Sequence, residues 1–328
     1  IDSIVMACSG TEANEVALMM VRTATGRRGI VCTDAAYHGN SAEVAAMTRL
    51  PAGEQRDAVR SIPTPDLFRP PEPGLSADDL CRLSIRHLEE AIERLEADGH
   101  GFAAFVLCPI LANEGLPQAP PGFFEQMMAT VHAAGGLVVA DEVQAGFGRT
   151  GEWWGYERSG FMPDVVTMGK PMGNGVPVSG AAASHDVVSA FRAGHRYFNT
   201  FAASPLQAAA GNAVLDEIER RGLVAQSRRV GEEMLAGLRA LQAHDPRMGD
   251  VRGHGLFVGV DWVVPGTTDP DERGAAAMVE ALKRRGMLMG RAGRHANLLK
   301  IRPPLVFDSD HAQSFLAGFA DALGDAPH

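Results

Sequence analysis

The sequence predicts a doubly wound α/β fold, in which helices cover both faces of a mostly parallel sheet. Short apolar runs alternate with longer amphipathic segments through most of the chain. Each run ends near Gly, Asp or Lys, which is typical of a strand that is buried on both faces. The order strand, helix, strand indicates crossover connections, and these join parallel neighbours.

Six apolar runs predict the strands of this sheet. They are SIVMACSG from Ser3, GIVCTDAAYHG from Gly29, FAAFVLCPI from Phe102, GLVVADEV from Gly136, PDVVTMGK from Pro163 and VSGAAAS from Val178. Three segments between them place their apolar residues on one helical face, or carry the capping residues of a helix. We expect these helices over residues 12–25, 76–98 and 122–134, each followed by a glycine.

The alternation of apolar runs and helical segments ends near Ala208. Two long helical patterns follow, over residues 206–223 and 224–243, and then an alternating strand at 255–263 and a last helix from Ser309. We therefore expect a large domain over residues 1–215, and a linker helix with a smaller C-terminal α+β domain over residues 216–328.

Composition and charge favour small-molecule chemistry. The 328 residues are 45% hydrophobic and 21% charged, with a net charge of −10 and no basic run. No apolar stretch reaches the about 18 residues that a membrane span needs. The net charge and the lack of basic runs predict no nucleic-acid or membrane partner. The four cysteines show no C-x-x-C spacing, so we expect no metal site and a reducing, cytoplasmic location.

The first residues, IDSIVMACSG, lack an initiator Met and enter a predicted strand at once. No secretory signal pattern is present in them. We therefore expect that an upstream segment is missing from this sequence.

Polar residues with chemical potential follow several of the predicted strands, at the edge where functional groups collect in open α/β sheets. Gly10 and Thr11 open a helix that could bind a phosphate or simply be capped. Asp141 could cap a loop or hold a cationic atom, and Lys170 could be solvated or form a Schiff base. Tyr37 could stack on a planar ring or pack in the core.

Taken together, these residues are the parts that pyridoxal 5′-phosphate requires: a helix start for its phosphate, a carboxylate for its ring nitrogen and a lysine for its aldehyde. A dinucleotide site is the alternative, because residues 146–151, GFGRTG, match a glycine fingerprint. That stretch is not followed by a predicted helix, so we interpret its glycines as a turn.

Motifs over nearly the whole chain resemble those of the class III pyridoxal-phosphate aminotransferases, which have fold type I. The motifs are SGTEANEVAL, YHGN, DEVQAGFGRTGEWWGYE, PDVVTMGKPMGNGVPVSG, FNTFAASPLQAAAG, VRGHGLFVGV and LLKIRPPLVF, in the order of the family. The resemblance implies pyridoxal phosphate as cofactor and a homodimer as the working form.

The resemblance also implies a role for individual residues. Lys170 resembles the lysine that forms the Schiff base, and Asp141 the partner of the ring nitrogen. Gly10 and Thr11 resemble the phosphate-binding pair, with Thr200 reaching the phosphate of the neighbouring subunit.

Four further roles are implied around the cofactor ring and the substrate. Tyr37 would stack on one face of the ring, Val143 would pack on the other, and Gln144 would lie near the phenolic oxygen. Arg302 resembles the arginine that binds a substrate carboxylate, for which its planar fork is suited.

The implied reaction moves an amino group from an amino acid or amine donor to an oxo-acid acceptor. One departure matters, because Cys108 and Asn113 stand where many relatives have glutamates, and Glu114 is one position off. The lack of the second glutamate indicates that Arg302 stays available for a substrate carboxylate. The same feature is similar to a branch of the family that includes alanine–glyoxylate aminotransferases and amino-alcohol phosphate phospholyases. Two alternatives to the aminotransferase stay open: a lyase that eliminates phosphate, and an inactive, truncated fragment. A nicotinamide dehydrogenase is a fourth and more remote hypothesis.

Overall fold

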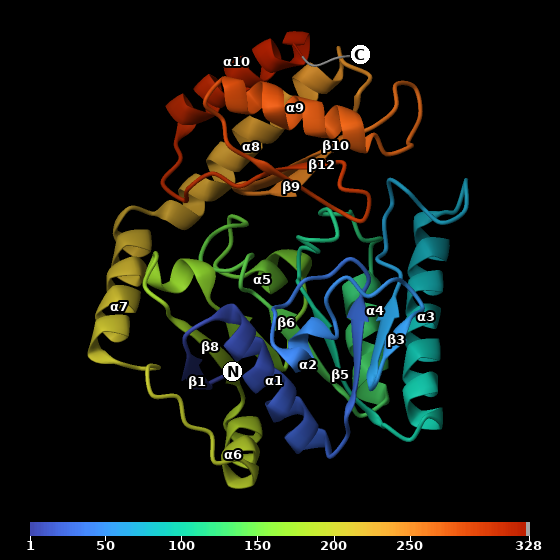
Figure 1. Cartoon of the computed structure of the whole chain (residues 1–328), viewed down its shortest axis with the longest axis vertical. Helices are drawn as coiled ribbons and strands as arrows, with labels where there is room; N and C mark the ends of the chain where they lie inside the picture. Colours follow the sequence, from blue (N-terminus) through green and yellow to red (C-terminus); the bar gives the residue numbers. More distant parts are fainter. Residues whose placement is uncertain (326–328) are drawn as a thin grey trace.

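The computed structural model describes residues 1–325 and contains two β-sheets with helices packed around them (Figure 1). The strands of the larger sheet are β1 (Ser3–Ala7), β2 (Gly29–Thr33), β3 (Gln55–Arg56), β4 (Val59–Ile62), β5 (Phe102–Leu107), β6 (Leu137–Asp141), β7 (Val165–Met168) and β8 (Ser179–Ala183). Their order across the sheet is β1-β8-β7-β6-β5-β2-β4-β3. All six predicted runs are strands, and the predicted α/β class is confirmed.

The larger sheet is mostly parallel. Strands β4, β2, β5, β6 and β7 pair in parallel, whereas β8 runs antiparallel to both β7 and β1. The reason is the short connection of residues 169–178 between β7 and β8, because a parallel neighbour needs a longer crossover. The carboxyl ends of β1, β2, β5, β6 and β7 therefore meet at one edge of the sheet.

Helices cover both faces of this sheet, as a doubly wound fold requires. They are α1 (Gly10–Thr25), α2 (Ala42–Ala45), α3 (Ala77–Ala97), α4 (Phe123–Ala133), α5 (Gly155–Ser159) and α6 (His185–Gly194), with a 3₁₀ turn η1 (Lys170–Gly173). Val16 and Met20 of α1 pack on one face of the sheet, and Leu88 of α3 with Met127 of α4 packs on the other. The three predicted helices are present, and α1 ends at Gly26 in the left-handed conformation that favours glycine.

The second sheet has four strands, β9 (Met248–His254), β10 (Phe257–Trp262), β11 (Gly290–Ala292) and β12 (Leu298–Ile301), in the order β11-β12-β10-β9. It is reached through α7 (Pro205–Arg220) and α8 (Leu223–Gln242), and α9 (Glu272–Arg284) and α10 (Ser309–Asp325) complete the region. The helices α8, α9 and α10 bury one face of this sheet in a core of its own. The predicted domain boundary at 215 and 216 lies inside α7, and the division into two domains stays a prediction.

The opposite side of the second sheet packs on the loops that follow β5 and β6. Phe257 and Leu298 lie in one apolar cluster with Cys108, Ile110 and Ala145. The second sheet thus covers the edge at which the parallel strands end (Figure 1). Residues of both sheets line a cavity between them. Within residues 1–325, no helix combines the length and apolar character needed to cross a membrane.

Candidate active site

Two adjoining cavities lie at the carboxyl edge of the larger sheet. The inner cavity, of about 110 Å³, is lined by Gly10, Thr11, Tyr37, His38, Gly39, Asp141, Val143, Gln144 and Lys170. The outer cavity, of about 640 Å³, shares Tyr37, Gln144 and Lys170 with it and is closed on the other side by residues of β11, β12 and the loop between them. The structure therefore brings together every predicted cofactor-binding residue except Thr200, and it places Arg302 in the outer cavity.

The start of α1 forms one end of the inner cavity. The first N–H groups of a helix have no partner within it, so those of Gly10 and Thr11 are donors for an anion. Thr11 Oγ1 accepts the N–H of Asn40 at 3.3 Å, which leaves its own proton for donation. A Cβ atom at Gly10 would lie 2.8 Å from Val143 Cγ1, so only glycine lets Val143 lie this close to the helix start.

Asp141 forms the floor of the inner cavity and is only 6% exposed. Its Oδ2 accepts from His38 Nδ1 at 2.7 Å and from Asn14 Nδ2 at 3.0 Å, and its Oδ1 accepts the N–H of Val143 at 3.0 Å. Oδ1 keeps acceptor capacity for one further donor. A cationic N–H in the inner cavity would supply that donor.

The neighbouring carboxylate, Glu142, points to the other side of the strand. It accepts the N–H groups of Gly155 at 2.9 Å and Tyr156 at 2.8 Å, which caps the start of α5. Burial raises the pKa of Glu142 to about 7. The two adjacent carboxylates thus have separate partners, as the alternation of side chains along a strand predicts.

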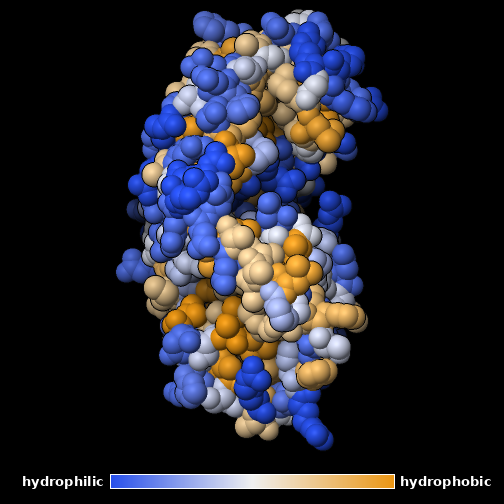
Figure 2. All heavy atoms as spheres, turned by 90° about the vertical axis from the view of Figure 1, so that its left-hand side faces the viewer, coloured by the Kyte–Doolittle hydropathy of each residue, from blue (hydrophilic) through white to orange (hydrophobic). Residues whose placement is uncertain are grey.

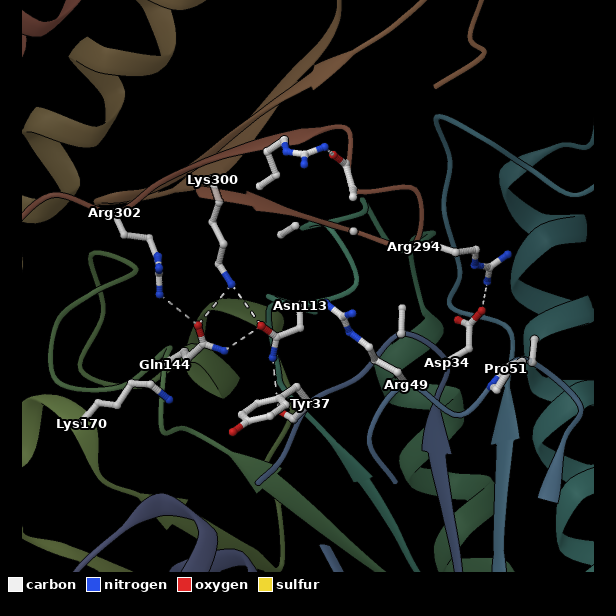
Figure 3. Close-up of a pocket in the computed structure, with 16 residues that line it drawn as sticks. Asp34, Tyr37, Arg49, Pro51, Asn113, Gln144, Lys170, Arg294, Lys300 and Arg302 are labelled. Carbon is white, nitrogen blue, oxygen red and sulfur yellow. Dashed lines mark hydrogen bonds and ion pairs between the residues drawn. The ribbon is translucent and has the colours of Figure 1, made fainter. Parts of the chain in front are cut away.

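Lys170 follows β7 and lines both cavities. Lys170 is exposed as a residue, but partial burial of its amine lowers the pKa of Lys170, and the negative charge of Asp141 opposes that shift. A lowered pKa raises the fraction of free amine, which is the form that acts as a nucleophile or a base. Figure 3 shows the Lys170 side chain extending toward Tyr37 and Gln144.

A hydrogen-bond network of four side chains joins the two sheets at the border of the cavities (Figure 3). Gln144 Oε1 accepts from Lys300 Nζ at 3.2 Å and from Arg302 Nη1 at 3.4 Å. Asn113 Oδ1 accepts from Gln144 Nε2 at 3.2 Å and from Lys300 Nζ at 3.1 Å. This network orients Lys300 of β12, and Arg302 directly after it, toward Gln144, which follows β6.

Lys300 is a site residue that the sequence analysis missed. It is 6% exposed, and burial together with the positive charge of Arg302 lowers the pKa of Lys300 to about 8. The signal was present in LLKIRPP, because Lys300 and Arg302 are two positions apart and so share one face of a strand.

Glu114 turns away from the cavities, in line with its shifted position in the sequence. It accepts from Thr33 Oγ1 at 2.6 Å and from the N–H of Asn113 at 3.0 Å, and burial raises its pKa. Within residues 1–325, Arg302 forms no ion pair with a carboxylate, and its guanidinium is held by Gln144. Arg302 is therefore available for an anionic ligand.

Three more arginines line the outer cavity. Arg294 pairs with Asp34, and Arg291 bonds to Glu272 and to the carbonyl of Ala296. The side chain of Arg49 points into the cavity in Figure 3 from a backbone with φ of 47°, in the left-handed region. Asp34 is the only carboxylate among the lining residues of the described chain, so the outer cavity carries a strong excess of positive charge.

A comparison with protein families decides which group the chain belongs to. The model of the class-III aminotransferases matches residues 1–323. The chain belongs to the class-III aminotransferase family. Pyridoxal phosphate is the cofactor of this family, and the inner cavity fits it, because a helix start, a buried carboxylate with spare acceptor capacity and a lysine of lowered pKa surround one space.

Individual relatives differ in their named activity. A Drosophila melanogaster protein named alanine–glyoxylate aminotransferase 2-like is 35% identical over 96% of this chain and 66% of its own length. A Caenorhabditis elegans protein named ethanolamine-phosphate phospho-lyase homolog 1 is 33% identical over 95% of this chain and 70% of its own length. The chain thus spans about two thirds of the length of these curated relatives.

Solved structures show the same split. A phospholyase from Arthrobacter in complex with phosphoethanolamine superposes with a TM-score of 0.94 and 37% identity, over 100% of this chain and 78% of the other. A transaminase with L-alanine superposes with a TM-score of 0.88 and 27% identity, over 98% of this chain and 80% of the other. These likenesses bear out the predicted fold type I.

Thr200 lies outside both cavities of its own chain. It is exposed on the segment between α6 and α7, where Asn199 bonds to Glu12 Oε1 at 3.4 Å. Phe198 and Phe201 beside it are 83% and 77% exposed. Figure 2 shows hydrophobic side chains gathered on the lower half of the face that includes α7.

Proposed function

We propose that the protein is a pyridoxal-phosphate-dependent aminotransferase that moves an amino group from an amino acid or amine to an oxo acid. One observation carries the proposal: Lys170, with a lowered pKa, and Asp141 flank the inner cavity, while an unpaired Arg302 faces the space next to them. The lysine amine suits the aldehyde of the cofactor, the aspartate carboxylate suits its ring nitrogen, and the arginine suits a substrate carboxylate.

The residues of the inner cavity would hold the cofactor. Gly10 and Thr11 would bind its phosphate, Asp141 its ring nitrogen, and Tyr37 and Val143 would pack on the two faces of the ring. When bound, pyridoxal phosphate withdraws electrons from the carbon that bears the substrate nitrogen.

Lys170 would act both as the attachment point of the cofactor and as the base. Its uncharged Nζ would accept the proton from the substrate carbon that carries the amino group. Gln144 would lie near the phenolic oxygen of the cofactor, where it is already fixed by Lys300, Arg302 and Asn113.

Arg302 would bind the carboxylate of the donor and then of the acceptor. A guanidinium donates two parallel hydrogen bonds to a carboxylate, and no internal acid competes for Arg302 within residues 1–325. This favours an amino acid and an oxo acid over a simple amine as the substrate pair.

A phospholyase that eliminates phosphate from a phosphorylated amino-alcohol is a second candidate. The excess of arginines and lysines around the outer cavity favours it, because a phosphate monoester brings about two negative charges. The named activities of two relatives support it as well. Both reactions begin with the same proton transfer to Lys170, so the candidates differ in what leaves the substrate afterwards.

We also propose that the working form is a homodimer in which Thr200 reaches the phosphate site of the partner. The exposed Phe198 and Phe201 beside Thr200 support this, since large exposed apolar patches mark interaction surfaces. Valine in place of Thr200 should weaken cofactor binding without changing the sedimentation of the dimer, and a monomeric wild type would contradict the proposal.

Product analysis tests the two activities. The chain, saturated with pyridoxal phosphate, is given alanine with glyoxylate or 2-oxoglutarate, and separately phosphoethanolamine; pyruvate and inorganic phosphate are measured. We expect pyruvate from the first mixtures and none from Lys170→Ala. Release of phosphate without pyruvate would assign the phospholyase reaction instead. A chain that takes up no cofactor would contradict both and support the inactive-fragment alternative.

A further inference from the structure

His38 is a buried residue at the inner cavity to which neither reaction assigns a role. It follows Tyr37 in the loop after β2, and its side chain is 1% exposed. Its Nδ1 lies 2.7 Å from Asp141 Oδ2, the same oxygen that receives the Asn14 amide. The two side chains thus hold one oxygen of the carboxylate that faces the cofactor site.

The orientation of the Asn14 amide is fixed by its other bonds. Thr167 Oγ1 donates to Asn14 Oδ1 at 2.6 Å, and Asn14 Nδ2 donates to the carbonyl of His38 at 2.7 Å. The nitrogen of the amide therefore faces Asp141. Asn14 is 2% exposed and Thr167 is fully buried, so this arrangement is packed on all sides.

These contacts also determine where the proton of the His38 ring lies. An ionised carboxylate only accepts, so Nδ1 must carry the proton that is shared with Asp141. His38 Nε2 is buried and has no hydrogen-bond partner among the described residues. The group that His38 turns toward Asp141 is therefore the Nδ1–H donor.

We infer that His38 is a positioning residue for Asp141: its Nδ1–H group donates to Oδ2 and fixes it, which leaves Oδ1 to bind the ring nitrogen of the cofactor. The inference rests on the proposed cofactor site.

Three variants of His38 separate the donor from the shape of the side chain. His38→Asn places an amide nitrogen near the position of Nδ1, His38→Gln extends its amide toward the position of Nε2, and His38→Phe has no donor. We expect the dissociation constant for pyridoxal phosphate to rise about tenfold in the Gln and Phe variants, which corresponds to one lost hydrogen bond to a charged group, and less than threefold in the Asn variant.

A spectroscopic readout tests orientation directly. With ring-nitrogen ¹⁵N-labelled pyridoxal phosphate, the nitrogen shift should report a protonated ring in the wild type and in His38→Asn. A smaller protonated fraction is expected in His38→Gln and His38→Phe. The nitrogen shift does not depend on turnover. A general loss of packing would change it in both polar variants, and not in His38→Gln alone.

His132 provides a matched control. It lies on α4 outside the cavities and pairs with Asp164 through Nε2 at 2.9 Å. His132→Phe should leave cofactor affinity and the nitrogen shift unchanged. Equal affinity and an equal shift in wild type and His38→Gln would overturn the inference, as would an Asn variant as impaired as the Gln variant. Failure of the wild type to bind pyridoxal phosphate would instead overturn the proposed function.

Discussion

The inner and outer cavities are built in different ways. The inner cavity is enclosed by loops at the strand ends of the larger sheet, and its carboxylate, Asp141, is buried and bonded to Asn14 and His38. The outer cavity is completed by the second sheet and is lined by several cations, of which Arg49 and Arg302 are exposed. Close packing determines the arrangement of the inner cavity, and charge determines that of the outer cavity.

We therefore expect the inner cavity to determine the reaction and the outer cavity to determine which substrates bind. Replacing a group of the inner cavity would remove a contact to the proposed cofactor, so the loss should be large and should affect every substrate. Replacing a cation of the outer cavity changes the local charge, so the loss should be smaller and should depend on the charge of the substrate.

The largest effect is expected from Lys170→Ala. Among residues 1–325, Lys170 is the only lysine that lines both cavities, so this change removes the proposed base, and general-base groups contribute about 10² to 10⁴ in rate. We expect a fall of at least about 10³-fold in kcat for all substrates, and loss of the absorbance of lysine-bound cofactor.

Lys283 is a suitable control for this change, because it lies on α9 with only an i,i+3 ion pair to Glu280. Lys283→Ala should keep the wild-type rate and spectrum. An unchanged cofactor spectrum in Lys170→Ala would show that the lysine of the inner cavity does not hold the cofactor.

An intermediate effect is expected from Lys300→Met, which keeps an unbranched side chain one atom shorter and removes the charge. KM for anionic substrates should rise about 10- to 100-fold, because a charge-assisted contact and the bonds to Asn113 and Gln144 are lost. Initial rates over a range of concentrations of amino-acid donors, and of amine donors that lack a carboxylate, measure this. A change in kcat with unchanged KM would place Lys300 with the inner cavity instead.

The pH dependence of stability provides a second test of Lys300. Its pKa is about 8 in the folded state, below the ordinary 10.5, so the unfolded state binds more protons between these values. The free energy of unfolding should therefore rise with pH from about 8 to 10.5, by up to about 3 kcal/mol relative to Lys300→Met. Urea unfolding of both proteins at several pH values measures the difference, and a constant difference would contradict the shift.

The sequence predicted the larger sheet well because its strands are buried on both faces and read as continuous apolar runs. Strand β4 was missed, because Arg60 interrupts its pattern; the structure buries this arginine with bonds to the carbonyl of Asp57 and to Asp98. Strand β9 was missed for a similar reason. Its Arg252 bonds to Asp250 and to Asp261, a pairing across strands that no local pattern shows.

The candidate site divides in the same way. The residues that surround the inner cavity follow strands or open a helix, so their order along the chain indicated their meeting place. Lys300, Arg49 and the hydrogen bond of His38 depend on how distant segments pack. A sequence pattern could have placed Lys300 on the face of Arg302, but it could not have shown that Gln144 lies opposite.

The smallest effect is expected at Arg49, where charge and backbone strain can be separated. A non-glycine residue in the left-handed region costs about 1–2 kcal/mol, and Arg49 has φ of 47° with its N–H bonded to the carbonyl of Ala36 at 2.8 Å. Arg49→Ala and Arg49→Gly both remove the guanidinium, but only glycine relieves the strain. Both should raise KM for anionic substrates by a few-fold, and thermal unfolding should show the Gly variant more stable than the Ala variant by about 1 kcal/mol. Equal KM values in wild type and variants would show that Arg49 does not contact the substrate. Equal stabilities of the two variants would show that the loop adjusts its backbone. Either result would weaken the distinction between an inner cavity determined by packing and an outer cavity determined by charge.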